Sequence, residues 1–368
     1  MNTSILADLN GNSHLAGLLD PARARSFYLS MPWWRTLSGA ALERGEALRI
    51  YVAENREGPR AALMARAGAK AFAGARVLRA LANMYSIEYE IVGDSPELDG
   101  ATLSAIARAI MAERPAWDVV DLGPFDRAAP SFERLAAELR SAGFWVQPYF
   151  HFGMWYERVD SRDFAAFFAA RPGVLRNTLR RGRARLDQLG QVEIRNIGGG
   201  AHLAPAIAAY EEVYARSWKP REPHPAFMPR LMHEASAVGA LRLGILSLDD
   251  SPIAAQLWIV WRRRASIFKL AHDQRYKHAS PGSVLTMHML RHAIDIDRVD
   301  EIDFGRGDDP YKRSWLGDRR EFWGLLACNT RTLRGMGAIL RHGGGAMGRR
   351  ALRRMTAIAA RAADGKRA

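Results

Sequence analysis

The sequence has a single cysteine, Cys328, in 368 residues. No disulfide can therefore form within the chain, and a reducing compartment is expected. No stretch approaches 18 uncharged apolar residues, so the sequence predicts no membrane-spanning helix. The first 20 residues lack a basic start followed by an apolar run, which argues against a signal peptide. These absences together predict a cytoplasmic protein.

Several enzyme signatures are also missing. There is no GxSxG segment and no phosphate-binding P-loop, and Cys328 has no histidine close in sequence, so hydrolase chemistry has no support. Residues 343–348 spell GxGxxG but follow no predicted strand, which argues against a dinucleotide fold. His288 and His292 share a helix face, but Met289 stands where a zinc protease needs glutamate. No third ligand is evident, and no metal is expected.

Acidic residues are scarce relative to basic ones. Lys and Arg number 53 against 39 Asp and Glu, a net charge of +14, which predicts an anionic partner. Residues 331–368 hold ten of the basic residues and one acid. As a helix, this tail would separate Met347, Ala351 and Met355 from its arginines. Such a helix can lie on an anionic membrane surface or pack on its own domain. Nucleic acid is not expected as a partner.

The chain contains an internal repeat. Strands expected near 48–51 and 60–65 have counterparts near 241–244 and 253–261, each pair joined by a polar turn. A further strand (86–92; 265–272), a helix (101–112; 284–297) and a buried strand (118–123; 301–305) follow in each half. The buried strands end in the matching triplets Asp121-Leu122-Gly123 and Asp303-Phe304-Gly305.

The fold class expected from this repeat is α/β, with two similar mixed β-sheet units flanked by helices. The first unit is assigned to residues 1–160 and the second to 199–330. An arginine-rich connecting helix within 161–198 carries a second basic patch from Arg171 to Arg185, interpreted as a solvated surface. The basic tail occupies 331–368.

One segment of the second half has no equivalent in the first. It lies between an expected strand and helix and contains Arg275, Tyr276, Lys277, Ser280, Pro281, Gly282 and Ser283. Ser280 suits an N-cap and Pro281 a first helical position. Free amides beside two cations predict a phosphate or pyrophosphate site, although an ordinary capped helix would look similar. The corresponding residues 93–99 carry Asp94, Glu97 and Asp99, which would repel phosphate.

The segments 276–285 and 303–312 together resemble acyltransferases of the GNAT superfamily of the CelD type. These are similar to the Fem-type aminoacyltransferases, which also carry two GNAT units. Tyr214 to Lys219 and Pro32-Trp33-Trp34 match further segments of that pattern. The resemblance spans roughly residues 27–326 and implies acyl-CoA or another acyl carrier as donor, with its pyrophosphate on residues 276–283. It also implies direct attack of an amine on the thioester.

Such a reaction needs a general base, donors for the developing oxyanion and a proton for the thiolate. Asp308 and His272 are the candidate bases, although a turn aspartate or a partly buried histidine would look the same. Tyr311 is the candidate acid, and Lys312 could offset anionic charge. Trp218, Lys219, Gln256 and Arg306 are candidate acceptor contacts; Gln256 could instead hydrogen-bond inside the sheet, and Trp218 could be a packing anchor.

The favoured function is N-acyl transfer from acyl-CoA to an amine at the inner membrane surface. A lipidic amine, as in formation of a ceramide-type amide, would fit the tail and the tryptophans expected to be exposed (Trp33, Trp34, Trp155 and Trp323). Alternatives are acetylation of an amino sugar or exopolysaccharide precursor, aminoacyl transfer from a charged tRNA, and a non-catalytic scaffold.

Overall fold

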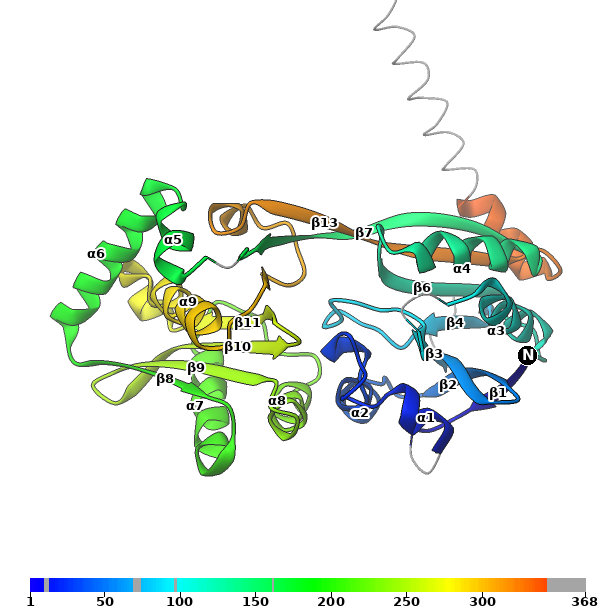
Figure 1. Ribbon diagram of the computed structural model, residues 1–368, viewed down its shortest axis with the longest axis horizontal. Coiled ribbons are helices and arrows are strands. Elements are labelled where there is room, and N and C mark those ends of the chain that lie inside the picture. The colour runs from blue at the N-terminus through cyan, green and yellow to red at the C-terminus, as the bar shows by residue number, and fades with distance from the viewer. Residues whose placement is uncertain (10–12, 69–73, 96–97, 161, 343–368) are drawn as a thin grey trace, which may run out of the picture.

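The computed structural model of the protein describes residues 1–9, 13–68, 74–95, 98–160 and 162–342. Within these residues, 13 strands form one continuous sheet in the order β1-β2-β3-β4-β6-β13-β7-β12-β11-β10-β9-β8, with β5 beside β3. Helices pack above and below the strands of each half (Figure 1). The mixed α/β architecture with two helix-flanked units is confirmed.

The first unit begins with an antiparallel meander and then alternates helices and strands. Its elements are β1 (Asn2–Leu6), α1 (Ser13–Leu18), η1 (Phe27–Leu29), α2 (Met31–Ala40), β2 (Glu46–Asn55), β3 (Gly58–Gly68), β4 (Val77–Ala80), β5 (Val92–Gly93), α3 (Gly100–Ala112), β6 (Val119–Asp126), α4 (Pro130–Ser141) and β7 (Phe144–Arg158). Asp99 caps α3, because its carboxylate accepts from the Thr102 amide.

The second unit repeats this arrangement after two linking helices. Its elements are α5 (Phe164–Ala169), α6 (Gly173–Leu189), β8 (Val192–Ile197), η3 (Gly200–His202), α7 (Leu203–Ala215), α8 (Phe227–Ala237), β9 (Leu241–Leu248), β10 (Ser251–Trp261), β11 (Arg264–His272), η4 (Gln274–Ala279), α9 (Pro281–Arg291), η5 (His292–Ile296), β12 (Glu301–Asp303), η6 (Pro310–Ser314) and β13 (Asp318–Asn329). A last helix spans 333–342.

The expected repeat is present in the backbone pairing. In each unit an antiparallel hairpin, β2–β3 or β9–β10, is followed by a parallel pair, β4–β6 or β11–β12. The last parallel partners are Arg79 with Asp121 and Ser266 with Asp303. The two Asp-x-Gly triplets therefore occupy equivalent positions.

One expected strand is wrong. Residues 86–91 form no strand, and the fourth strand is Val77–Ala80 instead. The apolar alternation that suggested a strand has another cause, because Tyr85, Ile87, Tyr89 and Ile91 are all buried. This segment fills the space between packed elements without joining a ladder.

Two long strands bind the units together. β13 pairs with β7 along its whole length, from Asp318–Tyr156 to Asn329–Phe144. The C-terminal part of β13 also pairs with β6 of the first unit, while the C-terminal part of β7 pairs with β12 of the second. Each unit thus receives a strand from the other, and both strands run from one half of the molecule into the other (Figure 1). A boundary at residue 160 or 330 does not separate two independent sheets.

The expected exposure of the tryptophans is wrong for two of them. Trp33 and Trp34 in α2 are fully buried, and Trp33 packs edge-on against Tyr28 and Phe227. Trp155 and Trp323 are half-buried. Aromatic residues that suggested a lipid contact therefore mainly form the core.

The connecting region contains two helices and a strand. The arginines of α6 are exposed as expected, but Arg171, just before it, is buried against Glu157. β8 pairs with β9 and so extends the second unit's sheet. Of the helices among the described residues, none combines the length and apolar character needed to cross a bilayer. Residues 343–368, where the basic amphipathic helix was expected, lie outside the described residues.

Candidate active site

The candidate site is a cleft where two parallel strands of the second unit separate. β11 and β12 pair only from Arg264–Glu301 to Ser266–Asp303. Beyond that point β11 continues to His272, whereas the other strand turns away at Gly305. The cleft between them has a volume of about 240 Å³. Its lining residues are Met84, Tyr85, Ile87, Lys219, Ile267, Phe268, Lys269, Leu270, Phe304, Arg306, Asp309, Tyr311 and Lys312.

Gly305 allows the two strands to approach each other closely at the base of the cleft. Its φ of +58° lies in the left-handed region, and an added Cβ would stand 2.7 Å from the Ile267 carbonyl oxygen. A larger residue would therefore be strained and would also collide with the opposite strand. The Asp303-Phe304-Gly305 triplet noted in the sequence thus sets the point at which the strands diverge.

Cations outnumber acids in this cleft. Lys219, Lys269, Arg306 and Lys312 line it, against the single carboxylate of Asp309. The Lys312 Nζ lies 3.3 Å from the Asp309 carboxylate and donates to the Arg306 carbonyl at 2.8 Å. Lys219 and Arg306 have no carboxylate within ion-pair distance in the described part of the chain. The cleft therefore favours an anionic or electron-rich ligand group.

Glu222 holds one wall of the cleft in place. Its carboxylate accepts hydrogen bonds from the Lys269 Nζ at 2.6 Å and from the Tyr85 hydroxyl at 2.5 Å. Burial alone would raise the pKa of Glu222, but the hydrogen bonds from Lys269, Tyr214 and Tyr85 lower it. Glu222 is thus ionised and fully engaged at neutral pH. Tyr85 belongs to the first unit, so both units build the site.

Two groups in the cleft have the protonation behaviour that acyl transfer needs. Burial, reinforced by the nearby Lys269, lowers the pKa of Lys219 to about 8. Burial and the Asp309 charge raise the pKa of Tyr311 to about 12, so its hydroxyl keeps its proton at neutral pH. One side chain can accept a proton near pH 8, and the other can donate one.

Four of the predicted residues meet in this cleft: Lys219, Arg306, Tyr311 and Lys312. Asp308 does not line it. Its carboxylate accepts two hydrogen bonds from Arg319, at 2.8 and 2.7 Å, on the exposed side of the turn. The Arg319 hydrogen bond lowers the pKa of Asp308, which weakens it as a base. Asp308 is thus held away from the cleft by its partner.

His272 and Trp218 lie together at the end of β11, with ring centroids 4.5 Å apart. Burial lowers the pKa of His272, so its imidazole is neutral at pH 7. Neither residue lines the cleft. The His272 Nδ1 atom stands 3.2 Å from where a Cβ on Gly282 would lie, which places the ring beside the start of α9.

Gln256, a candidate acceptor contact, makes its hydrogen bonds inside the protein instead. It is fully buried, and its side-chain amide donates to the Gly282 carbonyl at 2.8 Å and to the Thr286 hydroxyl at 2.7 Å. Its Oε1 atom accepts from the Trp258 indole at 2.8 Å. The sequence had left an internal hydrogen-bonding role open, and Gln256 has that role: it fixes the first turn of α9.

The expected phosphate loop follows the end of β11 at His272 and leads into α9, which begins at Pro281. Pro281 is the first helical residue, as predicted, and the amides of Gly282 and Ser283 head the helix, where no intrahelical carbonyl can reach them. Ser280 occupies the N-cap position but makes no side-chain cap, because its φ is +53°. Tyr276 packs against the core of the second unit.

The charges around this loop differ from the expectation. Arg275 pairs with buried Asp273 at 2.6 Å, so its charge is compensated, while Lys277 is exposed. The connecting helix contributes instead: the Arg185 guanidinium donates to the His278 carbonyl at 2.6 Å. An added Cβ at Gly182 would stand 2.8 Å from the Ala279 carbonyl oxygen, so α6 packs closely on the loop.

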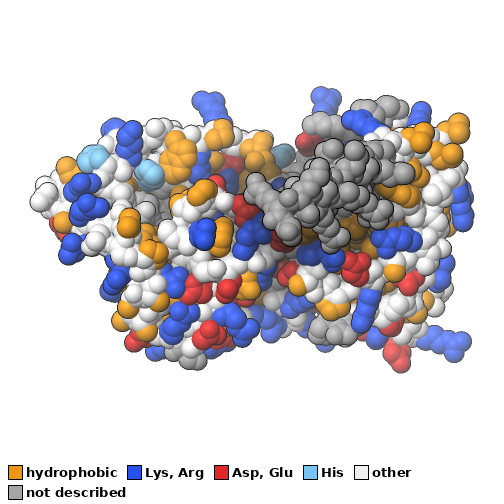
Figure 2. Space-filling model, turned by 90° about the horizontal axis from the view of Figure 1, so that it is seen from above, with side chains coloured by type: hydrophobic (Ala, Val, Ile, Leu, Met, Phe, Trp, Pro, Cys, Tyr) orange, Lys and Arg blue, Asp and Glu red, His pale blue; other side chains and the backbone are white. Residues whose placement is uncertain are grey.

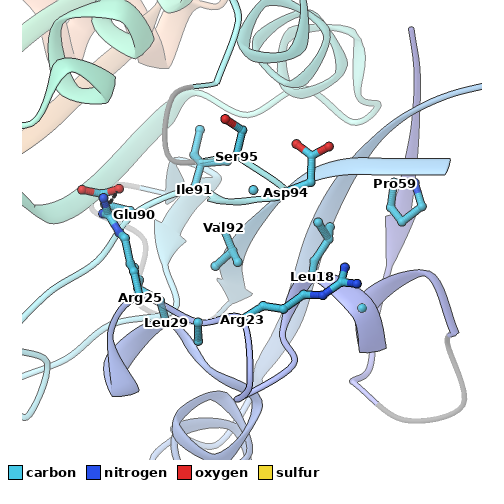
Figure 3. A pocket seen from close by; sticks show the side chains of 13 residues that line it. Leu18, Arg23, Arg25, Leu29, Pro59, Glu90, Ile91, Val92, Asp94 and Ser95 are labelled. Atoms are coloured by element: carbon cyan, nitrogen blue, oxygen red, sulfur yellow. Dashed lines mark ion pairs between the residues drawn. The ribbon is translucent and has the colours of Figure 1, made fainter. Parts of the chain in front are cut away.

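The first unit has a different pocket beside its equivalent loop. It has a volume of about 360 Å³ and lies between residues 17–29 and 90–95. Arg25 and Glu90 face each other at one end, and Asp94 and Pro59 lie on the other side (Figure 3). Asp94 pairs with Arg60 at 2.6 Å. Of the acidic residues noted in the sequence, Asp94 is thus engaged in an ion pair, and Asp99 caps α3.

Tyr85 and Lys269 line the cleft and Glu222 holds them in place, but none of these side chains was predicted from the sequence. Tyr85 and Glu222 meet across 137 positions of sequence, so no local spacing could connect them. Lys269 lies on β11, whose amides were considered only as oxyanion donors. Its charged side chain between the apolar residues Phe268 and Leu270 was an available signal.

Comparisons with known proteins agree with this geometry. Residues 174–313 match the acetyltransferase (GNAT) domain family. FemX is similar in structure, with a TM-score of 0.61 and 10% identity over 89% of this chain and 97% of that one. A conserved protein of unknown function from Bacteroides thetaiotaomicron has a TM-score of 0.54 and 11% identity, over 88% of this chain and 100% of its own. No curated protein matches in sequence.

Residues 174–313 of the second unit thus match a GNAT acetyltransferase domain, and the chain as a whole has the fold of FemX, built from two GNAT-like units. These matches do not distinguish a CelD-type or ceramide-forming enzyme from other proteins with this fold.

Proposed function

We propose that the protein is an acyl-CoA-dependent N-acyltransferase whose thioester lies in the cleft between β11 and β12. The observation that carries this proposal is the divergence of the two parallel strands at Ser266–Asp303, with the free amides at the start of α9 beyond the far end of β11. The helix start can hold a pyrophosphate, and the strand amides of β11 near Lys269 can donate to the thioester oxygen. The acceptor amine lies beside Lys219 and Tyr85.

In this reaction the amine nitrogen attacks the thioester carbon, the C–N bond forms and the C–S bond breaks. Lys219, in its neutral form, accepts the proton that the nitrogen loses. The Tyr311 hydroxyl donates a proton to the departing thiolate and recovers it from solvent. The charges of Arg306 and Lys312 stabilise the negative charge that develops on the sulfur. The products are an amide and free CoA.

The direct test is thiol release from acyl-CoA by the purified protein. The acceptors compared would be a long-chain amino alcohol, an amino sugar and no acceptor. Release that requires both protein and amine supports the proposal, and release with the sugar alone favours the polysaccharide-precursor alternative. A protein that binds no acyl-CoA in calorimetry would instead support a non-catalytic role.

Aminoacyl transfer from tRNA is the second candidate, favoured by the likeness to FemX and by the exposed arginines of α6. Figure 2 shows Lys and Arg side chains on both halves of the molecule. Phosphate contacts of that kind weaken steeply with salt. Activity that disappears on ribonuclease treatment and does not depend on acyl-CoA would select this candidate.

Gly282→Leu is expected to weaken donor binding about tenfold or more. Its added side chain would meet the His272 ring and cover the amides at the start of α9. Calorimetric titration with CoA measures the effect. Gly173→Leu is the matched control, because Gly173 heads α6 and has no atom near its added Cβ. Equal CoA affinity in both variants would contradict the proposed phosphate site.

A membrane-facing surface accompanies the proposed lipidic acceptor. Leu333, Met336 and Leu340 are exposed along one side of the last helix, and Arg331 and Arg334 lie beside them. Apolar side chains flanked by arginines favour an anionic lipid interface.

We expect the protein to co-sediment with anionic vesicles, and Leu333→Ser/Leu340→Ser to reduce the bound fraction severalfold. Neutral vesicles are the control. Undiminished binding by the double variant would place the contact elsewhere.

A further inference from the structure

The first unit has its own strand divergence, and it too opens a groove. β4 and β6 pair in parallel from Val77–Val119 to Arg79–Asp121 and then separate. The groove beyond them, here called the polar groove, has a volume of about 340 Å³. Its lining residues are Arg66, Arg79, Ala80, Ala82, Asn83, Met84, Asp121, Gly123, Pro124, Tyr149, His151 and Arg306.

The polar groove adjoins the cleft between β11 and β12, because Met84 and Arg306 line both. The Arg306 guanidinium lies over the Phe152 ring at 4.6 Å, and its Nη2 atom is 3.3 Å from the His151 Nδ1. Burial lowers the pKa of Arg306, and no carboxylate compensates its charge among the described residues. If a ligand extends from the cleft into the polar groove, Arg306 can donate hydrogen bonds to its polar groups.

In the other direction the polar groove continues into an apolar one, because Arg79 and Asp121 line both. This apolar groove has a volume of about 500 Å³. Val77, Val119 and Leu326 line it from β4, β6 and β13. The last helix lines it with Arg334, Gly337, Ala338, Arg341 and His342. The outer side of the same helix carries Leu333, Met336 and Leu340.

The three spaces follow one another as cleft, polar groove and apolar groove. We propose that they bind one amphiphilic acceptor: its amine lies in the cleft, its hydroxyl, carbonyl or phosphate lies against Arg306 and His151, and its hydrocarbon chain lies beside the last helix. This inference rests on the proposed N-acyltransferase function and assigns its acceptor to single-chain amphiphiles. The exposed apolar side of the last helix provides a route from a lipid surface.

Chain length should then control the reaction. Each methylene buried in the apolar groove is worth up to about a fourfold gain in affinity. The test is a series of amino alcohols from 2 to 18 carbons, assayed with one acyl-CoA. In the wild-type protein, kcat/KM is expected to rise with length until the groove is filled.

Gly337→Trp is the blocking variant. Gly337 is a helical residue that lines the groove, and an added Cβ there meets no atom within 4 Å, so a bulky side chain can be placed beside the groove without a backbone clash. We expect kcat/KM for long-chain acceptors to fall at least tenfold, while that for short acceptors stays unchanged. Gly173→Trp is the matched control, because it adds the same side chain at another open helical glycine far from the groove in sequence.

The short acceptors separate the two proposals. Turnover of short amines by both variants shows that the transferase function is intact, so a loss confined to long chains reports on the groove alone. Binding of a long-chain amino alcohol to wild-type and Gly337→Trp protein, measured by calorimetry without donor, gives a readout that does not depend on activity.

Three results would overturn the inference. The first is a wild-type protein whose kcat/KM does not depend on acceptor length. The second is a Gly337→Trp variant whose kcat/KM equals that of the wild type at every acceptor length. The third is a chain ending at His342 that binds long-chain acceptors at least tenfold more tightly, because residues 343–368 would then be the occupant of the groove.

Discussion

Lys219→Met is expected to lower kcat about 100-fold or more, the range typical of losing a general base. The methionine has a similar length and apolar stem but cannot accept a proton. The wild-type rate should rise as pH increases through about 8, because burial and Lys269 lower the pKa of Lys219 to that value and only the neutral amine is a base. The variant should lose this rise. Steady-state kinetics from pH 6 to 10 would measure both effects.

The acceptor must not titrate in the same range, so a weakly basic aromatic amine is the appropriate substrate. Asp308→Asn is the matched control, because it alters the base predicted from sequence, which Arg319 holds in an exposed ion pair. Its effect on kcat should be small. A pH–rate profile of Lys219→Met that still has its inflection near pH 8 would show that Lys219 is not the base. A larger loss of kcat in Asp308→Asn than in Lys219→Met would indicate that Asp308 is the base.

The order of strands and helices within each unit could largely be predicted from sequence. Alternating apolar residues and matching Asp-x-Gly triplets are local patterns, and the structure places Asp121 and Asp303 at equivalent points. The exchange of β7 and β13 could not be predicted. Which strand pairs with which depends on contacts between distant segments, and no residue spacing records it.

The candidate site was predictable only in part, for the same reason. Tyr311 and Lys312 follow β12 closely in sequence, so the resemblance could place them, and Lys219 came with a second matching segment. Tyr85 lies in the other unit, on a segment whose apolar alternation suggested a strand. The partners that decide protonation, such as Arg319 beside Asp308, likewise come from other elements.

Arg171→Met is expected to lower the free energy of unfolding by about 3 kcal/mol, near the lower end for breaking a buried ion pair. The sequence placed Arg171 in a solvated basic patch, yet its side chain is only 9% exposed. It donates to both carboxylate oxygens of Glu157 on β7, one at 2.5 Å and the other at 2.6 Å, and to the Trp315 carbonyl. Urea denaturation would measure the loss.

Glu157 would keep the Arg162 guanidinium at 3.0 Å and the Gly317 amide at 3.0 Å, which limits the loss. Arg180→Met is the control, because Arg180 is exposed on α6. Glu157→Gln/Arg171→Met should recover part of the stability, since no uncompensated carboxylate stays buried.

Burial raises the pKa of Glu157, but hydrogen bonds from Arg171 and Arg162 outweigh it and lower the pKa overall. The contribution of Glu157 is therefore present above its unfolded pKa and is lost as pH falls through the lower folded value. The stability difference between wild type and Arg171→Met should shrink in acid, and a difference that is constant with pH would show that packing, not charge, makes Arg171 important.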